Sequence, residues 1–302
     1  MTRTAQEFGD EHTKKKLETV EAYLRAFTIA LKRQNFTLYY VDAYAGSGAS
    51  VSKQSRTRTD TISNQVALGI SPEIVDTDEI VQGSATRALS INPPFDRYLF
   101  NDVKRSNVRS LAEIVRNRFP HLQDRVEITQ QDANAKLRAL CSSVDWKCSR
   151  AVVFLDPFGL QIKYDTLCEL ARTKAVDLWY LVPVFAMYRQ IRTDGQVIAD
   201  GGRSVDEALG TDAWREVVVD KGPVQNSLFG EPVELTSRAV DIAWFEKVAR
   251  ERLNVAFNGR VVDRALPLGR NGLHEFSLMF ASANPSGPAW ALASKLAKAV
   301  LK

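Results

Sequence analysis

A glycine-rich turn follows the first β-rich segment of the chain, in VDAYAGSG at residues 41–48. The acid Asp42 closes the apolar run, and Gly46 and Gly48 come shortly after it. Because glycine has no Cβ, the backbone can approach a ligand closely at these two positions. An acid followed by such a turn is typical of a binding site for a nucleotide-like ligand at the carboxyl edge of a parallel sheet. A short glycine turn also occurs for structural reasons alone. The residues expected to shape this site are Asp42, Ala43, Tyr44, Ala45, Gly46 and Gly48.

Two further acids end later apolar runs, Asp102 in YLFND and Asp132 in QQDAN. We predict that Asp102 accepts the ribose hydroxyls of an adenosine, and that Asp132, with Ala133 beside it, contacts the adenine. Each acid could instead cap the helix that follows it. The dinucleotide fingerprint is incomplete, since Val51 stands where its third glycine belongs. This disfavours NAD and favours S-adenosylmethionine, which has no pyrophosphate to bind.

The segment FLDPFG at 154–159 ends a continuous apolar run with an acid, a proline and an aromatic residue. It resembles the D-P-P-Y/F loop of amino-group methyltransferases that act on adenine or cytosine. That resemblance implies that Asp156 and the Pro157 carbonyl orient the target amine, and that Phe158 stacks on a base presented outside its helix. Here the second proline is missing and Gly159 follows directly, which puts recognition of the target base in doubt more than cofactor binding. An ordinary strand-to-loop turn is the alternative.

Several motifs together resemble the three-Cys-motif partner protein family, which is itself similar to a bacterial ribosomal-RNA adenine-N6 methyltransferase. The resemblance covers about residues 12–185 and rests on HTKKKLETVEAYL, YYVDAYAGSG, QGSATRAL, YLFND and FLDPFGL. It implies a methyltransferase fold and a three-Cys-motif protein as a partner, and it leaves the substrate open. It also implies that His12 and Lys16, one helical turn apart, face the site and contact the cofactor. One departure is Ala85, where a proline is usual.

The elements that must position these residues alternate between apolar runs and amphipathic stretches, which indicates an α/β fold with a mostly parallel sheet. We predict a Rossmann-like class I methyltransferase fold with a helical insertion after the fifth strand. The expected strands are 36–44, 95–102, 125–134, 149–159, 175–183 and 273–282, and the expected helices are 12–33, 82–90, 104–119, 134–142 and 288–302. Residues 50–80 are expected to form a loop.

Three regions are predicted along the chain. Residues 1–185 form the cofactor-binding core, 186–270 a mostly helical insertion that selects substrate, and 271–302 the last strand and a closing helix. Just beyond the fifth strand, aromatic and basic side chains could line a base-binding cleft, although an ordinary amphipathic helix is the alternative. The residues expected to bind substrate are Gly159, Phe185, Tyr188 and Arg189.

Composition narrows the class of protein. The 302 residues are 45% apolar and 25% charged, as in an ordinary globular protein. The polar N-terminus and the absence of a long apolar run predict a cytoplasmic protein that does not span a membrane.

The spacing of the three cysteines is not that of a zinc site, so we expect no metal. Basic residues gather at 104–118, either as a solvated helix face or as a phosphate-binding surface.

The sequence therefore predicts an S-adenosylmethionine-dependent methyltransferase that acts on an exocyclic amino group of a nucleobase, with RNA or DNA as its partner. Two alternatives stay open. One is a methyltransferase for a protein, a peptide or a small molecule, and the other is a non-enzymatic partner of a three-Cys-motif protein.

Overall fold

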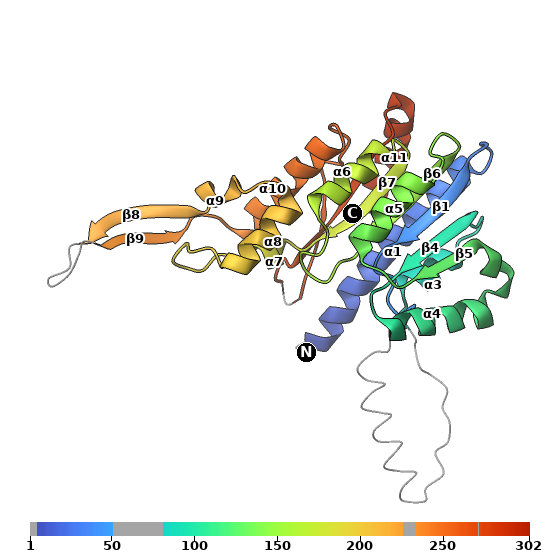
Figure 1. Ribbon diagram of the computed structural model, residues 1–302, viewed down its shortest axis with the longest axis horizontal. Coiled ribbons are helices and arrows are strands. Elements are labelled where there is room, and N and C mark those ends of the chain that lie inside the picture. Colours follow the sequence, from blue (N-terminus) through green and yellow to red (C-terminus); the bar gives the residue numbers. More distant parts are fainter. Residues whose placement is uncertain (1–4, 51–80, 226–232, 271) are drawn as a thin grey trace, which may run out of the picture.

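The computed structural model describes residues 5–50, 81–225, 233–270 and 272–302. At its centre lies a seven-stranded sheet in the order β10-β11-β7-β6-β1-β4-β5 (Figure 1). In that order the strands are Leu266–Leu268, Phe276–Ser282, Val176–Val182, Ser149–Leu155, Thr37–Asp42, Arg97–Asn101 and Val126–Thr129. The expected loop at 50–80 lies outside the described residues, apart from its first residue.

The sheet is mostly parallel. β1 pairs in parallel with β4 and β6, β4 with β5, and β6 with β7, whereas β11 runs antiparallel to β7 and β10 antiparallel to β11. Every residue of β7 is buried, as central parallel strands require, because helices cover both faces. The predicted α/β, Rossmann-like fold is confirmed.

Helices form a layer on each face of the sheet, and each layer has its own apolar cluster. One layer consists of α1 (Ala5–Leu31), α3 (Ser84–Leu89), α4 (Arg105–Arg118) and α11 (Gly287–Val300). The other consists of α5 (Ala133–Ser143), α6 (Tyr164–Arg172), α7 (Val184–Tyr188), α8 (Ala199–Leu209) and α10 (Ile242–Ala256). Helix α1 buries the stripe that its sequence spacing predicted, with Leu17, Val20, Leu24 and Phe27 all against the sheet.

The segment after the fifth strand contains the predicted helices and one element that was not predicted. Between α9 (Trp214–Val217) and α10, strands β8 (Val219–Gln225) and β9 (Val233–Arg238) pair antiparallel and project from the body as a long ribbon (Figure 1). β10 lies within the range 186–270 assigned to the insertion, yet it belongs to the central sheet.

The remaining short elements are β2 (Ala49–Ser50), which pairs with β3 (Val81–Gln82), and a 3₁₀ helix at Pro120–Arg125. In the parts of the chain described, no helix combines the length and the apolar character needed to cross a membrane.

Candidate active site

The glycine turn after β1 is tied to the neighbouring strand ends. The Ala45 amide donates to the carbonyl of Asn101 at 2.9 Å, and the Gly46 amide donates to the Asp102 carboxylate at 3.1 Å. Gly46 and Gly48 have φ of +60° and +77°, the left-handed region in which glycine is favoured. A Cβ on Gly46 would meet nothing within 4 Å, so this side of the turn opens onto free space that a ligand could fill.

The two glycines should respond differently to alanine. At Gly46 only the backbone conformation is strained, by about 1 kcal/mol. At Gly48 the new Cβ would also lie 2.8 Å from Leu111 Cδ1, so Gly48→Ala should lower the free energy of unfolding by about 2–4 kcal/mol. Urea unfolding of both variants measures this difference. Equal losses in the two variants would show that the Leu111 contact is not the reason for glycine at position 48.

Asp42, the last residue of β1, is fully buried. Its Oδ1 accepts from the Tyr44 amide at 3.1 Å, but its Oδ2 has no hydrogen-bond partner. Burial is the main cause of a pKa of about 7 for Asp42; the nearby Asp156 carboxylate adds to the shift, while Ser84, the Tyr44 amide and Lys16 oppose it. A buried acceptor without a donor is costly in a folded protein, and such groups gather at functional sites.

Asp156 follows β6 and forms an ion pair with Lys16 of α1. The sheet register explains the contact. Asp42 lies opposite Phe154 on β6, so Asp42 and Asp156 come from adjacent strand ends and project toward the face that α1 covers. The resemblance implied that Lys16 contacts the cofactor, and the structure places its ammonium on Asp156. His12, one turn earlier, has a buried Nε2 without a hydrogen-bond partner.

The loop after Asp156 presents an aromatic ring to solvent. Pro157 is buried, while Phe158 is 72% exposed, with the Lys104 ammonium 5.7 Å from the centre of its ring. The Phe158 amide donates to Gln161 Oε1 at 3.2 Å, and Gly159 has φ of +79° with open space where a Cβ would lie. An exposed ring beside a fixed carboxylate is the arrangement expected of a loop that stacks on a flat substrate.

The other two acids also serve as local anchors. The Asp102 carboxylate accepts from the Gly46 amide, from the Lys104 amide at 2.7 Å and from Asn107 Nδ2 at 3.0 Å. Three donors leave a carboxylate with little capacity for two ribose hydroxyls. Asp132 is exposed and caps α5 by accepting from the Ala135 amide at 2.9 Å, while Ala133 is buried in the first turn of that helix.

Two buried asparagines that the sequence analysis missed hold the strand ends together. Asn101 Nδ2 donates to the carbonyls of Ala43 and Gln131, which joins the ends of β1, β4 and β5. Asn134 holds the loop after β6, since its Nδ2 donates to the Gln161 carbonyl and its Oδ1 accepts from Thr166 Oγ1. The only signal in the sequence was that Asn101 directly precedes Asp102 and that Asn134 lies two residues after Asp132.

The predicted substrate-binding residues of α7 lie at the carboxyl end of β7, the strand next to β6. The Phe185 and Tyr188 rings stack with centroids 6.1 Å apart, Arg189 lies over Phe185 and Arg238 of β9 lies over Tyr188. Phe185 and Tyr188 are half-buried, and Arg189 is exposed. The aromatic and basic groups are therefore at the same edge of the sheet as Asp156.

Comparisons with known proteins give only remote likenesses. No protein-family model and no curated protein matches the sequence. Among solved structures, a DUF519 protein from Legionella pneumophila aligns over 90% of this chain and 96% of its own, with 15% identity and a TM-score of 0.39. A geranyl diphosphate methyltransferase solved with GPP and sinefungin aligns over 88% and 77%, with 9% identity and a TM-score of 0.30.

A third solved structure, an uncharacterised COG1565 superfamily protein from Burkholderia thailandensis, aligns over 87% of this chain and 66% of its own, with 10% identity and a TM-score of 0.28. At these identities and TM-scores the likenesses carry nothing about activity. The fold assignment rests on the order and direction of the strands.

Three features at this edge, at Gly46, Asp42 and Tyr44, leave room or a hydrogen-bonding group for a ligand such as an adenosyl cofactor. The open side of Gly46 and the unpartnered Oδ2 of Asp42 mark a place where a ligand can lie and donate a hydrogen bond. The Tyr44 hydroxyl is buried without a hydrogen-bond partner, and burial, with Tyr180 and Asp132 nearby, raises its pKa. Within the described residues, no three His, Cys, Asp or Glu side chains gather closely enough to hold a metal ion.

Proposed function

We propose that this protein is an S-adenosylmethionine-dependent methyltransferase that acts on an exocyclic amino group of a nucleobase in RNA or DNA. The observation that carries the proposal is the placement of the Asp156–Phe158 loop beside Asp42 and the open glycine turn, at neighbouring strand ends of one parallel sheet. A donor and an acceptor of a methyl group would meet there.

The chain's own residues would position the amine. One oxygen of Asp156 is held by Lys16, which leaves the other free to accept an N–H of the amino group, together with the Pro157 carbonyl. Phe158 would stack on the base, and Asp156 can take the proton that the alkylated nitrogen loses. When bound, the cofactor supplies an electrophilic methyl carried on sulfur, and Asp42, Gly46 and Tyr44 would contact it.

Cations along α4 support a nucleic acid as the acceptor. Arg105, Arg109 and Arg116 are exposed, and none of the three forms an ion pair with a described residue. They span about 16 Å along the helix, which begins three residues after Asp102. Lys104, over the Phe158 ring, connects this stripe to the candidate site. Unpaired cations that lead away from an exposed aromatic ring suit a single strand, since phosphates and bases are bound together.

Neutralising the stripe should weaken nucleic-acid binding without affecting the fold. The variant Arg105→Gln/Arg109→Gln/Arg116→Gln should bind single-stranded RNA or DNA at least 10-fold less tightly at 50 mM salt, and the slope of log affinity against log salt should become shallower by about 2. Fluorescence anisotropy at several salt concentrations measures both.

The matched control for the stripe is Lys32→Gln/Arg33→Gln/Lys147→Gln, which removes the same charge from exposed positions at the opposite edge of the sheet. It should leave the affinity and the slope nearly unchanged. Equal losses in the two triple variants would mean that only net charge matters and that α4 is not the binding surface.

Transfer of a labelled methyl group to total cellular RNA, DNA and protein tests the proposal as a whole. Label in nucleic acid supports it. Label in protein or a small molecule would favour the alternative that the shortened D-P-F-G loop suggests. Absence of transfer to any fraction, with and without a three-Cys-motif protein, would favour a non-enzymatic partner role.

A further inference from the structure

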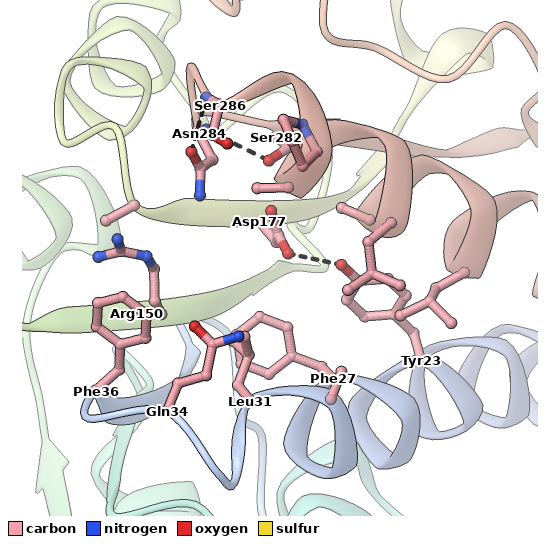
Figure 2. A pocket seen from close by; sticks show the side chains of 17 residues that line it. Tyr23, Phe27, Leu31, Gln34, Phe36, Arg150, Asp177, Ser282, Asn284 and Ser286 are labelled. Atoms are coloured by element: carbon pink, nitrogen blue, oxygen red, sulfur yellow. Dashed lines mark hydrogen bonds between the residues drawn. The ribbon is translucent and has the colours of Figure 1, made fainter.

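A cavity of about 410 Å³ lies at the opposite edge of the sheet from the candidate active site. It is lined by the C-terminal half of α1, the first turns of α11 and the amino ends of β6 and β7 (Figure 2). Nothing in the proposed methyl transfer uses it. The two sites lie at opposite ends of the same parallel strands, so one ligand cannot fill both.

Two opposite charges line this cavity without pairing. Asp177 of β7 lies opposite Val152 of β6, and Arg150 is two residues before Val152, so both side chains project from the same face of the sheet. No ion pair joins these two described residues. In Figure 2 the Asp177 side chain lies between Arg150 on one side and Tyr23 on the other.

Asp177 is a buried acid that lies beside two hydroxyl groups, those of Tyr23 and Ser282. It is 9% exposed, and its Oδ2 accepts from the Tyr23 hydroxyl at 2.6 Å. Burial raises the pKa of Asp177, while the Ser282 and Tyr23 hydroxyls and the distant charge of Arg150 oppose the shift. A buried carboxylate is stabilised by an additional donor, and a protonated amine is the strongest that a small ligand can offer.

The far wall of the cavity is electropositive. The guanidinium of Arg150 lies 3.8 Å from the centre of the Phe36 ring, and its Nη1 donates to the carbonyls of Trp146 and Ser149. The first turn of α11 also lines the cavity, and its N-cap Ser286 makes no side-chain capping bond, so the positive end of the helix dipole is not neutralised there. These two groups would attract a carboxylate.

The remaining lining of the cavity includes the apolar side chains of Phe27 and Leu31 from α1 and of Leu292 and Leu296 from α11. We propose that this cavity binds a free α-amino acid with an apolar side chain, whose ammonium group lies on Asp177, whose carboxylate lies toward Arg150 and the α11 N-terminus, and whose side chain packs between α1 and α11. Neither an amine nor a carboxylate alone would satisfy both ends.

Calorimetric titration with L-phenylalanine, phenethylamine and 3-phenylpropionate tests this directly. These probes share a ring and differ in charge. Phenylalanine should bind at least 10-fold more tightly than either of the others, and Asp177→Asn should weaken it at least 10-fold. Affinity for phenethylamine equal to that for phenylalanine, or an unchanged affinity in Asp177→Asn, would overturn the proposal.

Two further measurements test whether phenylalanine binds in this cavity. In Asp177→Asn the asparagine can still accept from Tyr23, and circular dichroism checks that the variant is folded. Ala289→Phe, which fills the cavity without replacing a charged group, should also abolish phenylalanine binding. Saturating S-adenosylhomocysteine should leave the phenylalanine affinity unchanged. Competition between them would place phenylalanine in the candidate active site and refute a second site, whether or not methyl transfer is observed.

Discussion

Replacing Asp156 by alanine should reduce methyl transfer to between about one-hundredth and one-thousandth of the wild-type rate while cofactor affinity stays within a few-fold. The carboxylate would orient the amine and take its proton, and loss of one such preorganised group commonly lowers a rate by about 10²- to 10³-fold. Asp156→Asn keeps an oxygen acceptor but cannot take a proton, so it should retain more activity than alanine. Single-turnover transfer and calorimetry with S-adenosylhomocysteine give the two quantities.

The control for this variant must separate chemistry from structure. Alanine at 156 leaves the Lys16 ammonium without its partner, so unfolding free energies are measured alongside. Asp165→Ala, an exposed acid in the first turn of α6, should leave both transfer and cofactor binding unchanged. If Asp156→Ala lost cofactor affinity as fully as activity, Asp156 would be a cofactor ligand and its assigned role would be wrong.

Much of the core could be predicted from two sequence patterns, continuous apolar runs and apolar residues at helical spacing. The continuously apolar runs at 151–155 and 178–182 have the pattern of strands buried on both faces, and they make up most of the central strands β6 and β7. The stripe of Leu17, Val20 and Leu24 has helical spacing, and it packs on the sheet. Glycine at 46 and 48 has its reason in positive φ.

What the sequence could not supply depends on partners that are distant along the chain. Strand β8, with Gly222 and Pro223 inside it, lacks a clear alternation of apolar and polar residues, so the hairpin β8–β9 was not predicted in the segment expected to be mostly helical. The carboxylate of Asp102 was expected to be free for a ribose, and its occupation by the Gly46 amide follows only from how β1 and β4 pair. The contact between Lys16 and Asp156 joins residues 140 positions apart, and only the packing of α1 on the sheet reveals it.

Asp42 should make the protein less stable as the pH rises from about 4 to about 7. Its pKa is about 7 in the folded state and about 3.9 in an unfolded chain, so within this window the folded protein holds a proton that the unfolded chain has lost. Stability then falls with increasing pH, by about 4 kcal/mol in total. Asp42→Asn should remove this contribution, so the variant should be more stable than the wild type at pH 8 and nearly equal to it at pH 4.

Urea unfolding at pH 4, 6 and 8 measures the effect, with Asp220→Asn, an exposed acid of β8, as the control that should not change the pH profile.

The Asp42→Asn variant also tests the proposed function. Ionised Asp42 has one oxygen without a donor, and a cofactor that supplies one would lower its pKa and recover part of the loss. S-adenosylhomocysteine should therefore stabilise the wild type more at pH 8 than at pH 5, whereas its effect on Asp42→Asn should not vary with pH. A pH-independent effect on the wild type would show that the cofactor does not reach Asp42.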